Sequence, residues 1–189
     1  GDFITAPHIS KIFSEMILIW IISAWKNIYR NKKINIVELG AGNGEMMHQI
    51  INTSKRFFNF HKKCKFIIYE KSPKLINVQK EKLKNEKIKW VKNLDYLESN
   101  PTIFLGNEFL DALPIKQYIK TNNVWFERYI QKKGGLYNFS NMEFNIKKVE
   151  KKLNLKISKN QKFLEISFEE YNIIKKLNKI VEKNGGCML

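Results

Sequence analysis

Cysteine, proline and arginine are scarce in this sequence of 189 residues, and no long hydrophobic run is present. Cys64 and Cys187 are too few and too far apart for a disulfide framework, a zinc site or a redox pair, so we expect a reducing compartment. The longest apolar stretch, 16–25, is interrupted by Ser23 and is well short of the roughly 20 residues that cross a bilayer. We therefore expect no membrane insertion.

Histidine is also scarce, and His8, His48 and His61 do not have the spacing of metal ligands, so we expect no metal. The net charge of +16 comes almost entirely from lysine. These lysines stand singly or in pairs, without an arginine-rich block or a basic-aromatic repeat, and the chain is also rich in isoleucine and asparagine. The charge therefore does not predict specific nucleic-acid binding.

With 43% hydrophobic and 28% charged residues, the composition is that of a folded globular protein of one domain. The chain starts at Gly1 in place of a methionine and stops within an apolar run after Gly185 and Gly186, which predicts truncation at both ends. The oligomeric state is left open.

Strand-like and helix-like segments alternate in the first half of the sequence. Helical periodicity predicts a long helix from Thr5 to about Tyr29. Short β-branched runs predict strands, and amphipathic segments between them predict helices. The strands are 34–39, 66–70, 88–91 and 102–106, and the helices are 44–58 and 73–85. This alternation predicts an α/β fold with a parallel sheet and right-handed crossovers.

The second half begins with a β-hairpin, predicted from two alternating segments, 116–120 and 124–131, around an Asn-Asn turn. Residues 134–135 continue this antiparallel region. Segment 138–158 is polar and rich in lysine and carries no clear pattern. A strand at 163–167 and a helix at 168–183 follow.

A glycine-rich turn lies between the first predicted strand and the next helix. Such a turn lets a ligand approach the backbone at a helix N-terminus. The glycines follow a GxGxG spacing in place of GxGxxG, and Glu38 stands two residues before the first of them. A carboxylate there repels a diphosphate and favours a cationic group such as a sulfonium or an α-amino group. The alternative is a tight strand-to-helix turn without a ligand.

Glu70 ends the second predicted strand, where α/β nucleotide sites place an acid on the ribose hydroxyls. The alternative is a surface glutamate beside Lys71. Together with the glycine turn, Glu70 indicates an adenosine-containing ligand at the carboxyl edge of the sheet.

Four motifs stand in order along the chain: GDFITAP at 1–7, ELGAGNG at 38–44, YEKSPKL at 69–75 and NEFLDALP at 107–114. With these motifs the chain resembles the MidA-like family of S-adenosylmethionine-dependent methyltransferases, found in bacteria and mitochondria. The mitochondrial member methylates an arginine of a respiratory complex I subunit. The resemblance implies a Rossmann-like class I methyltransferase with an inserted antiparallel β-hairpin region, a protein substrate, and a location in a bacterial cytoplasm or a mitochondrial matrix.

The resemblance also implies a division of the chain and a set of site residues. One methyltransferase domain would span 1–189, with a cofactor-binding half at 1–115, the hairpin region at 116–167, and a return helix and further strand at 168–189. The residues implied to bind S-adenosyl-L-methionine are Glu38, Gly40, Ala41, Gly42 and Gly44 at its methionine end, Glu70 at the ribose, Asn93 and Leu94 at the adenine, and Phe3 and Thr5 closing over it.

Asn107, Glu108 and Asp111 are the implied catalytic residues. We expect Glu108 and Asp111 on one side of a helical turn, where two carboxylates suit an arginine guanidinium. The alternatives are an acidic turn that caps a helix and, for Thr5, a helix N-cap. His8 replaces an acidic residue of the family, and Ala41 and Asn43 replace its usual proline and arginine.

Two other functions remain open at this point. A nicotinamide-dependent oxidoreductase is disfavoured by the GxGxG spacing and by Glu38. A non-catalytic assembly module would keep the fold and dock a partner through its hairpin and basic surface.

Overall fold

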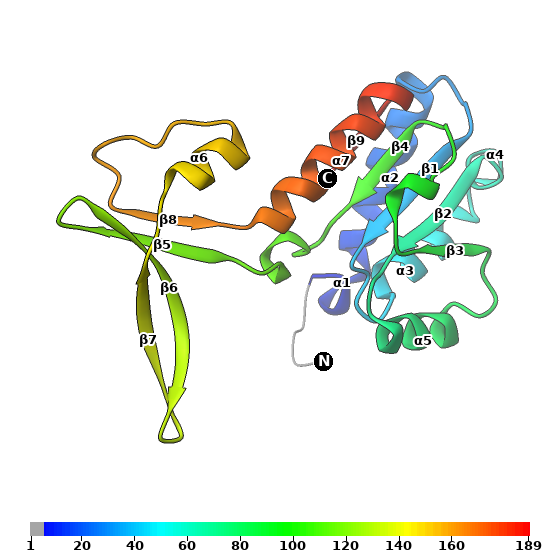
Figure 1. The fold of residues 1–189 in the computed structure, drawn as a ribbon. Helices are drawn as coiled ribbons and strands as arrows, with labels where there is room; N and C mark the ends of the chain where they lie inside the picture. The colour runs from blue at the N-terminus through cyan, green and yellow to red at the C-terminus, as the bar shows by residue number, and fades with distance from the viewer. Residues whose placement is uncertain (1–5) are drawn as a thin grey trace. The chain divides into compact units, whose positions relative to one another are not determined.

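The computed structural model describes residues 6–189, apart from the side chain of His8. It divides into two compact units. The first comprises the chain up to Asp111 together with Lys176–Leu189, and the second comprises Ala112–Lys175. Figure 1 shows the parallel sheet of the first unit and the long hairpin of the second.

Within residues 6–189, five parallel strands form the sheet of the first unit, in the order β3-β2-β1-β4-β9. Their bounds are β1 Ile34–Leu39, β2 Cys64–Tyr69, β3 Ile88–Val91, β4 Thr102–Leu105 and β9 Gly186–Met188. Every residue of β1 is buried, as expected for a central strand covered on both faces. The chain adds β2 and β3 on one side of β1 and then crosses to add β4 on the other. The crossing creates a switch point between β1 and β4, where α/β folds bind ligands.

The helices of this unit are α1 Ala6–Ile9, α2 Lys11–Asn27, α3 Glu45–Ser54, α4 Phe58–His61, α5 Pro73–Lys82 and the later part of α7 Phe168–Asn184. The single helix predicted from Thr5 to Tyr29 is wrong within the described residues. Ser10 has extended backbone angles, and its hydroxyl accepts a hydrogen bond from the backbone N–H of Ile12 at 3.2 Å. Ser10 is therefore the N-cap of a separate helix, a local signal that the continuous apolar pattern conceals.

The helix predicted over 44–58 is likewise two helices. α3 ends at Ser54, whose hydroxyl donates to the carbonyl of Ile51 at 2.7 Å, and α4 follows as a single turn. Trp25 of α2 packs edge-to-face on Phe60 of α4, with ring centroids 5.2 Å apart. These contacts close one end of the hydrophobic core between α2, α3 and the sheet.

An antiparallel sheet forms the second unit, in the order β7-β6-β5-β8. Its strands are β5 Lys116–Thr121, β6 Val124–Lys133, β7 Leu136–Glu143 and β8 Phe163–Ile166. The predicted hairpin is confirmed: Asn122 and Asn123 both have positive φ, as a tight two-residue turn requires. In the segment without a clear pattern, the structure contains most of β7 and the helix α6 Lys147–Leu153.

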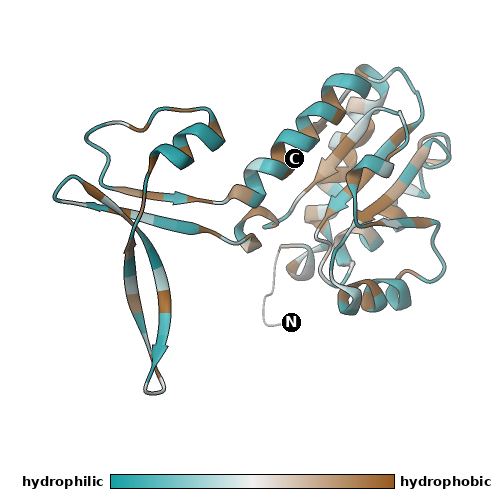
Figure 2. Ribbon diagram, in the orientation of Figure 1, coloured by the Kyte–Doolittle hydropathy of each residue, from teal (hydrophilic) through white to brown (hydrophobic). Residues whose placement is uncertain are grey.

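The second unit has its own small core, in which Tyr118, Trp125 and Val149 are buried. Figure 2 shows α6 largely in hydrophilic colours and the strands of the parallel sheet largely in hydrophobic ones. The predicted fold class, α/β with a mostly parallel central sheet and an antiparallel hairpin region, is confirmed.

Candidate functional site

The glycine turn leaves the carboxyl end of β1 and leads into α3. Gly40, Gly42 and Gly44 all have left-handed backbone angles, with φ of +64°, +54° and +83°. A Cβ on Gly40 would lie 2.6 Å from the ring of Phe109, and one on Gly44 would lie 3.1 Å from Leu83. On Gly42 it would meet no described atom within 4 Å. Gly40 and Gly44 are therefore required by packing as well as conformation, whereas Gly42 faces open space.

Glu38, the fifth residue of β1, is 4% exposed. Burial raises the pKa of its carboxyl from 4.5 to about 8, and a hydrogen bond from the backbone N–H of Met47 opposes the rise only in part. Among the described residues, its Oε2 atom is buried without a hydrogen-bond partner. A buried carboxyl oxygen without a partner is costly, and a ligand that brings a cation or a donor would relieve that cost.

Glu70 follows β2 directly and is 8% exposed, so the alternative of a surface glutamate is wrong. Its Oε1 accepts hydrogen bonds from the backbone N–H groups of Lys71 and Ser72, both at 2.9 Å. Its Oε2 accepts one from the side-chain amide of Gln79 at 3.2 Å. Each carboxylate oxygen can accept more than one hydrogen bond, so the bonded carboxylate can still receive ribose hydroxyls.

Asn93 and Leu94 lie after β3, where the adenine was expected. The side-chain oxygen of Asn93 accepts hydrogen bonds from the N–H of Asp95 at 3.1 Å and from Nζ of Lys176 at 2.9 Å. Leu94 is 2% exposed and begins the short 3₁₀ helix η1 Leu94–Tyr96. Their role beside an adenine stays a prediction.

The acidic turn after β4 departs from the expected geometry. Glu108 has a φ of +52°, and the short 3₁₀ helix η2 begins only at Leu110 and ends at Ala112. The prediction that Glu108 and Asp111 share one helical turn is therefore wrong, because Glu108 lies outside the helix in a left-handed conformation. Both side chains are exposed and Asn107 is half-buried. A non-glycine residue at positive φ costs of order 1 kcal/mol and is enriched at functional sites.

Phe109 anchors the acidic turn. Its ring lies against the backbone of Gly40 and packs edge-to-face on Tyr69, with centroids 6.2 Å apart. This contact joins the end of β4 to the ends of β1 and β2, so Glu108 belongs to the same edge of the sheet as the glycine turn. Phe109 was not predicted as a site residue, although an aromatic residue between two acids of a polar turn was the available signal.

Gln79 of α5 was also missed as a site residue. It is fully buried and contacts both the glycine turn and Glu70. The signal was its place on the apolar side of α5, where a leucine or isoleucine is expected. Two further predicted cofactor residues, Phe3 and Thr5, lie outside the described residues.

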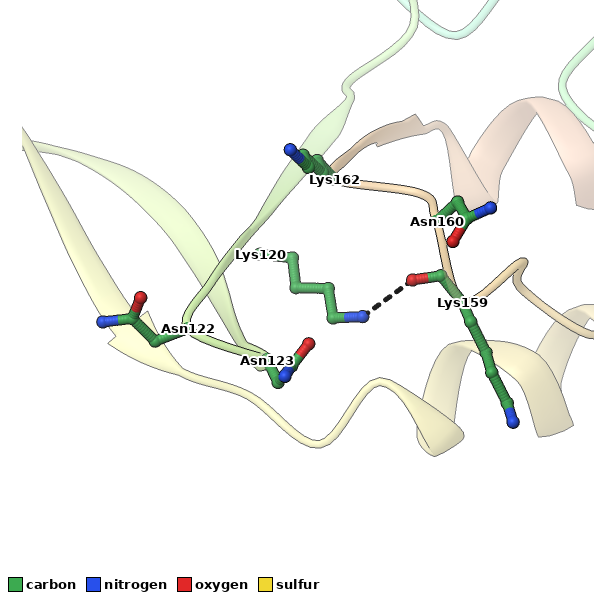
Figure 3. Close-up of a pocket in the computed structure, with 6 residues that line it drawn as sticks. All are labelled: Lys120, Asn122, Asn123, Lys159, Asn160 and Lys162. Atoms are coloured by element: carbon green, nitrogen blue, oxygen red, sulfur yellow. Dashed lines mark hydrogen bonds between the residues drawn. The ribbon is translucent and has the colours of Figure 1, made fainter.

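The second unit carries a separate pocket of about 450 Å³, shown in Figure 3. Its lining consists of lysine and asparagine side chains from the β5–β6 turn and the loop before β8: Lys120, Asn122, Asn123, Lys159, Asn160 and Lys162. Nζ of Lys120 donates to the carbonyl oxygen of Lys159 at 2.9 Å. The pocket contains none of the residues that the sequence analysis selected, so the candidate site is the carboxyl edge of the parallel sheet.

Among the described residues, no three His, Cys, Asp or Glu side chains are grouped closely enough to hold a metal ion. Nor does any helix in the described part of the chain have the length and apolar character needed to cross a membrane.

The fold and this edge define a class: a Rossmann-like α/β protein with a glycine turn, a buried acid that suits a cation, and a second acid that suits hydroxyl groups. Residues 16–189 match a family described as "Putative S-adenosyl-L-methionine-dependent methyltransferase". The chain belongs to that family, which confirms the family resemblance expected from its motifs.

The curated proteins that are similar to this chain are longer than it. The mitochondrial protein arginine methyltransferase NDUFAF7 homolog of Caenorhabditis elegans is 33% identical over an alignment of 150 residues that covers 69% of this chain and 35% of that protein. Human mitochondrial protein arginine methyltransferase NDUFAF7 is 30% identical over 154 residues, with the same coverage of 69% and 35%. The chain thus spans about a third of the length of the curated relatives it matches.

A protein from Burkholderia thailandensis, solved with bound S-adenosyl-homocysteine, has the same fold. Its TM-score is 0.71 at 19% identity, and the match covers 94% of this chain and 46% of that protein.

Proposed function

We propose that this chain is the cofactor-binding part of an S-adenosyl-L-methionine-dependent protein arginine methyltransferase. The observation that carries the proposal is the buried, unpartnered carboxylate oxygen of Glu38 before a glycine turn whose Gly42 faces open space. The description of the family names S-adenosyl-L-methionine as the cofactor, and the residues at the sheet edge suit the charged and hydroxyl groups of that molecule.

Each acid at the edge has a separate part in this proposal. Glu38 would bind the cationic methionine end of the cofactor, because its free oxygen is shielded from water and gains a partner only when a ligand arrives. Gly40, Ala41, Gly42 and Gly44 would let the ligand lie against the backbone. Glu70 would accept the ribose hydroxyls on a carboxylate already fixed by two backbone donors.

When bound, S-adenosyl-L-methionine supplies a methyl group attached to a positively charged sulfur. Glu108 and Asp111, with Asn107, would hold the guanidinium of the substrate and orient one nitrogen toward that group. Glu108 is the better candidate for taking the proton from this nitrogen, because its turn is anchored on Gly40 by Phe109. Asp111 would contribute a second, exposed acceptor.

The names of the relatives support a proposal for the substrate and the compartment. Those matched above are named mitochondrial protein arginine methyltransferases, so we propose a protein substrate with an accessible arginine. A subunit of respiratory complex I is the specific candidate that the family resemblance implies. The compartment would be the mitochondrial matrix in a eukaryotic source and the cytoplasm in a bacterial one.

Calorimetric titration with S-adenosylhomocysteine and NADH tests the cofactor. Binding of the first ligand alone is expected, and binding of NADH alone would instead support an oxidoreductase. The test should include the chain within its full-length protein, because the relatives are longer. If the full-length protein bound neither ligand, the proposed function would be wrong and a docking module would replace it.

Gly42→Val is the variant that tests the position of the ligand, and Gly134→Val is its matched control. Both glycines have similar φ, +54° and +59°, and in both cases a Cβ meets no described atom within 4 Å. The two substitutions therefore impose similar backbone strain, but only the first places methyl groups in the proposed site. We expect loss of cofactor binding in Gly42→Val alone. Equal binding in both variants would place the site elsewhere.

A further inference from the structure

Gln79 connects the two halves of the proposed site. Its Nε2 atom donates to the carbonyl oxygen of Gly42 at 2.9 Å and to Oε2 of Glu70 at 3.2 Å. Its Oε1 atom accepts a hydrogen bond from the indole N–H of Trp90 at 3.0 Å. The side chain of Gln79 is 0% exposed, and its bond to Glu70 is buried, whereas its bonds to Gly42 and Trp90 are part-buried.

The chemistry of the three partners fixes the orientation of the amide. An indole nitrogen only donates, so it has to face the amide oxygen of Gln79. A carbonyl and an ionised carboxylate only accept, so they have to face the amide NH₂. A flipped amide would present its oxygen to two acceptors and its NH₂ to a donor. Trp90 on β3 thus selects the one orientation in which Gln79 holds both Gly42 and Glu70.

These contacts determine where two ligand-facing groups lie. Gly42 belongs to the turn proposed to hold the methionine end, and Glu70 is the acid proposed for the ribose. Apart from the bond from Gln79, the carboxylate of Glu70 accepts hydrogen bonds from the backbone N–H groups of the two residues that follow it. A single buried amide therefore ties the ribose acid to the glycine turn across the sheet edge.

We propose that Gln79 is the positioning residue of the cofactor site, and that Trp90 acts through it by setting the orientation of its amide. This inference rests on the proposed function for the identity of the ligand. It assigns Gln79 no contact with the cofactor: its two N–H donors are already used by Gly42 and Glu70. Its effect is to hold both groups in the arrangement that one ligand needs at once.

The first test is Gln79→Met, which keeps the length of the side chain and removes both donors. We expect S-adenosylhomocysteine to bind at least tenfold more weakly, because Gly42 and Glu70 lose their shared partner. Trp90→Phe should weaken binding about threefold. If Trp90 acts through Gln79, the double variant should bind no more weakly than Gln79→Met alone.

The second test is Gln79→Glu, with Gln117→Glu as its matched control. Nε2 of Gln117 donates to Oε2 of Glu165 at 2.8 Å on the antiparallel sheet, so both substitutions turn an amide–carboxylate bond into a pair of carboxyl groups. Near neutral pH the pair at position 79 repels. As the pH falls, the pair takes up a proton, and the protonated carboxyl can donate to Glu70.

The affinity of Gln79→Glu relative to the wild type at the same pH should therefore recover as the pH falls. Gln117→Glu should match the wild type throughout. The pH profile is specific for positioning when circular dichroism shows Gln79→Glu folded at every pH, because loss of stability then does not contribute to the change in affinity.

The outcomes separate this inference from the proposed function. If the wild type binds S-adenosylhomocysteine and Gln79→Met binds it within twofold, Gln79 does not position the site, whatever the cofactor. If the wild type does not bind it, the proposed function fails first. Should Gln79→Met not fold, the pH profile of Gln79→Glu decides: recovery at low pH supports positioning, and a flat ratio overturns it.

Discussion

Binding of the cofactor should release a proton from Glu38. Burial raises the pKa of this carboxyl to about 8, so at pH 7 about nine-tenths of the free protein carries a neutral Glu38. A ligand ammonium placed against the unpartnered Oε2 favours the ionised form and returns the pKa toward its usual value near 4.5. The proton that Glu38 held then goes to the buffer.

The number of protons released follows from these two pKa values. If the bound carboxyl is fully ionised, about 0.9 proton leaves per ligand at pH 7 and about 0.1 at pH 9, where the free protein is already ionised. The same linkage makes the affinity for S-adenosylhomocysteine rise about eightfold per pH unit near pH 7 and level off above pH 8.

Calorimetry in several buffers of different ionisation enthalpy measures this directly. The slope of the observed heat against buffer enthalpy is the number of protons released. Glu38→Gln is the control, because its amide cannot ionise and has nearly the same shape, and it also subtracts any proton that the ligand itself exchanges. Equal slopes for the wild type and Glu38→Gln would refute the assignment of Glu38 to the cationic end of the cofactor.

The free protein offers an independent check on the same carboxyl. Since its pKa is raised on folding, the unfolded chain loses the proton near pH 4.5 while the folded chain keeps it up to about pH 8. Stability should therefore fall as the pH rises through this window, at up to about 1.4 kcal/mol per pH unit, and no such contribution should remain in Glu38→Gln. Urea unfolding of both proteins at pH 5 and pH 8 would show the difference.

Two further predictions concern the acidic turn and the start of α2. Glu108→Gly should stabilise the free protein by up to about 1 kcal/mol, because glycine adopts a positive φ without strain. The same variant should lose methyl transfer and keep cofactor binding. A variant that is less stable and still active would contradict the proposed role. Ser10→Ala should cost about 1 kcal/mol in thermal or urea unfolding, with cofactor affinity unchanged, and no loss would show that the cap does not stabilise α2.

The strands of the parallel sheet were predictable because their sequence signal is local. Segment 34–39 is a short apolar run ended by glycine, and a fully buried parallel strand needs nothing more. The points at which one helix ends and the next begins were harder to predict from the sequence. Apolar periodicity continues through Ser10, and only the competition between its hydroxyl and the helical backbone shows that one helix ends and another begins there.

The site residues were predictable where a chemically suitable side chain stands at the end of a predicted strand. Glu38 and Glu70 stand at the ends of predicted strands, so parallel pairing alone brings them to one edge. Gln79 and Trp90 reach the same edge through side-chain contacts between α5 and β3, which no spacing along the sequence encodes. The left-handed backbone of Glu108 is equally hidden, because it depends on how Phe109 packs against Gly40.

Three unfavourable features of the first unit lie together at the carboxyl edge of its sheet, although unpartnered buried atoms and positive φ angles also occur elsewhere in this unit, at Ser14, Asn35 and Gln49 and at Arg30 and Asn31. A buried carboxylate oxygen of Glu38 lacks a partner, Glu108 has a left-handed backbone, and Gly42 faces open space. Close to them, both carboxylate oxygens of Glu70 accept hydrogen bonds, and the amide of Gln79 uses both its N–H donors and its oxygen. The other polar groups named at this edge therefore have hydrogen-bond partners within the protein. What remains unsatisfied is a cation acceptor next to an open turn. A ligand that brings a cation and hydroxyl groups would relieve the cost that the free protein carries, which is why the unpaired oxygen of Glu38 is stronger support for cofactor binding than the glycine spacing alone.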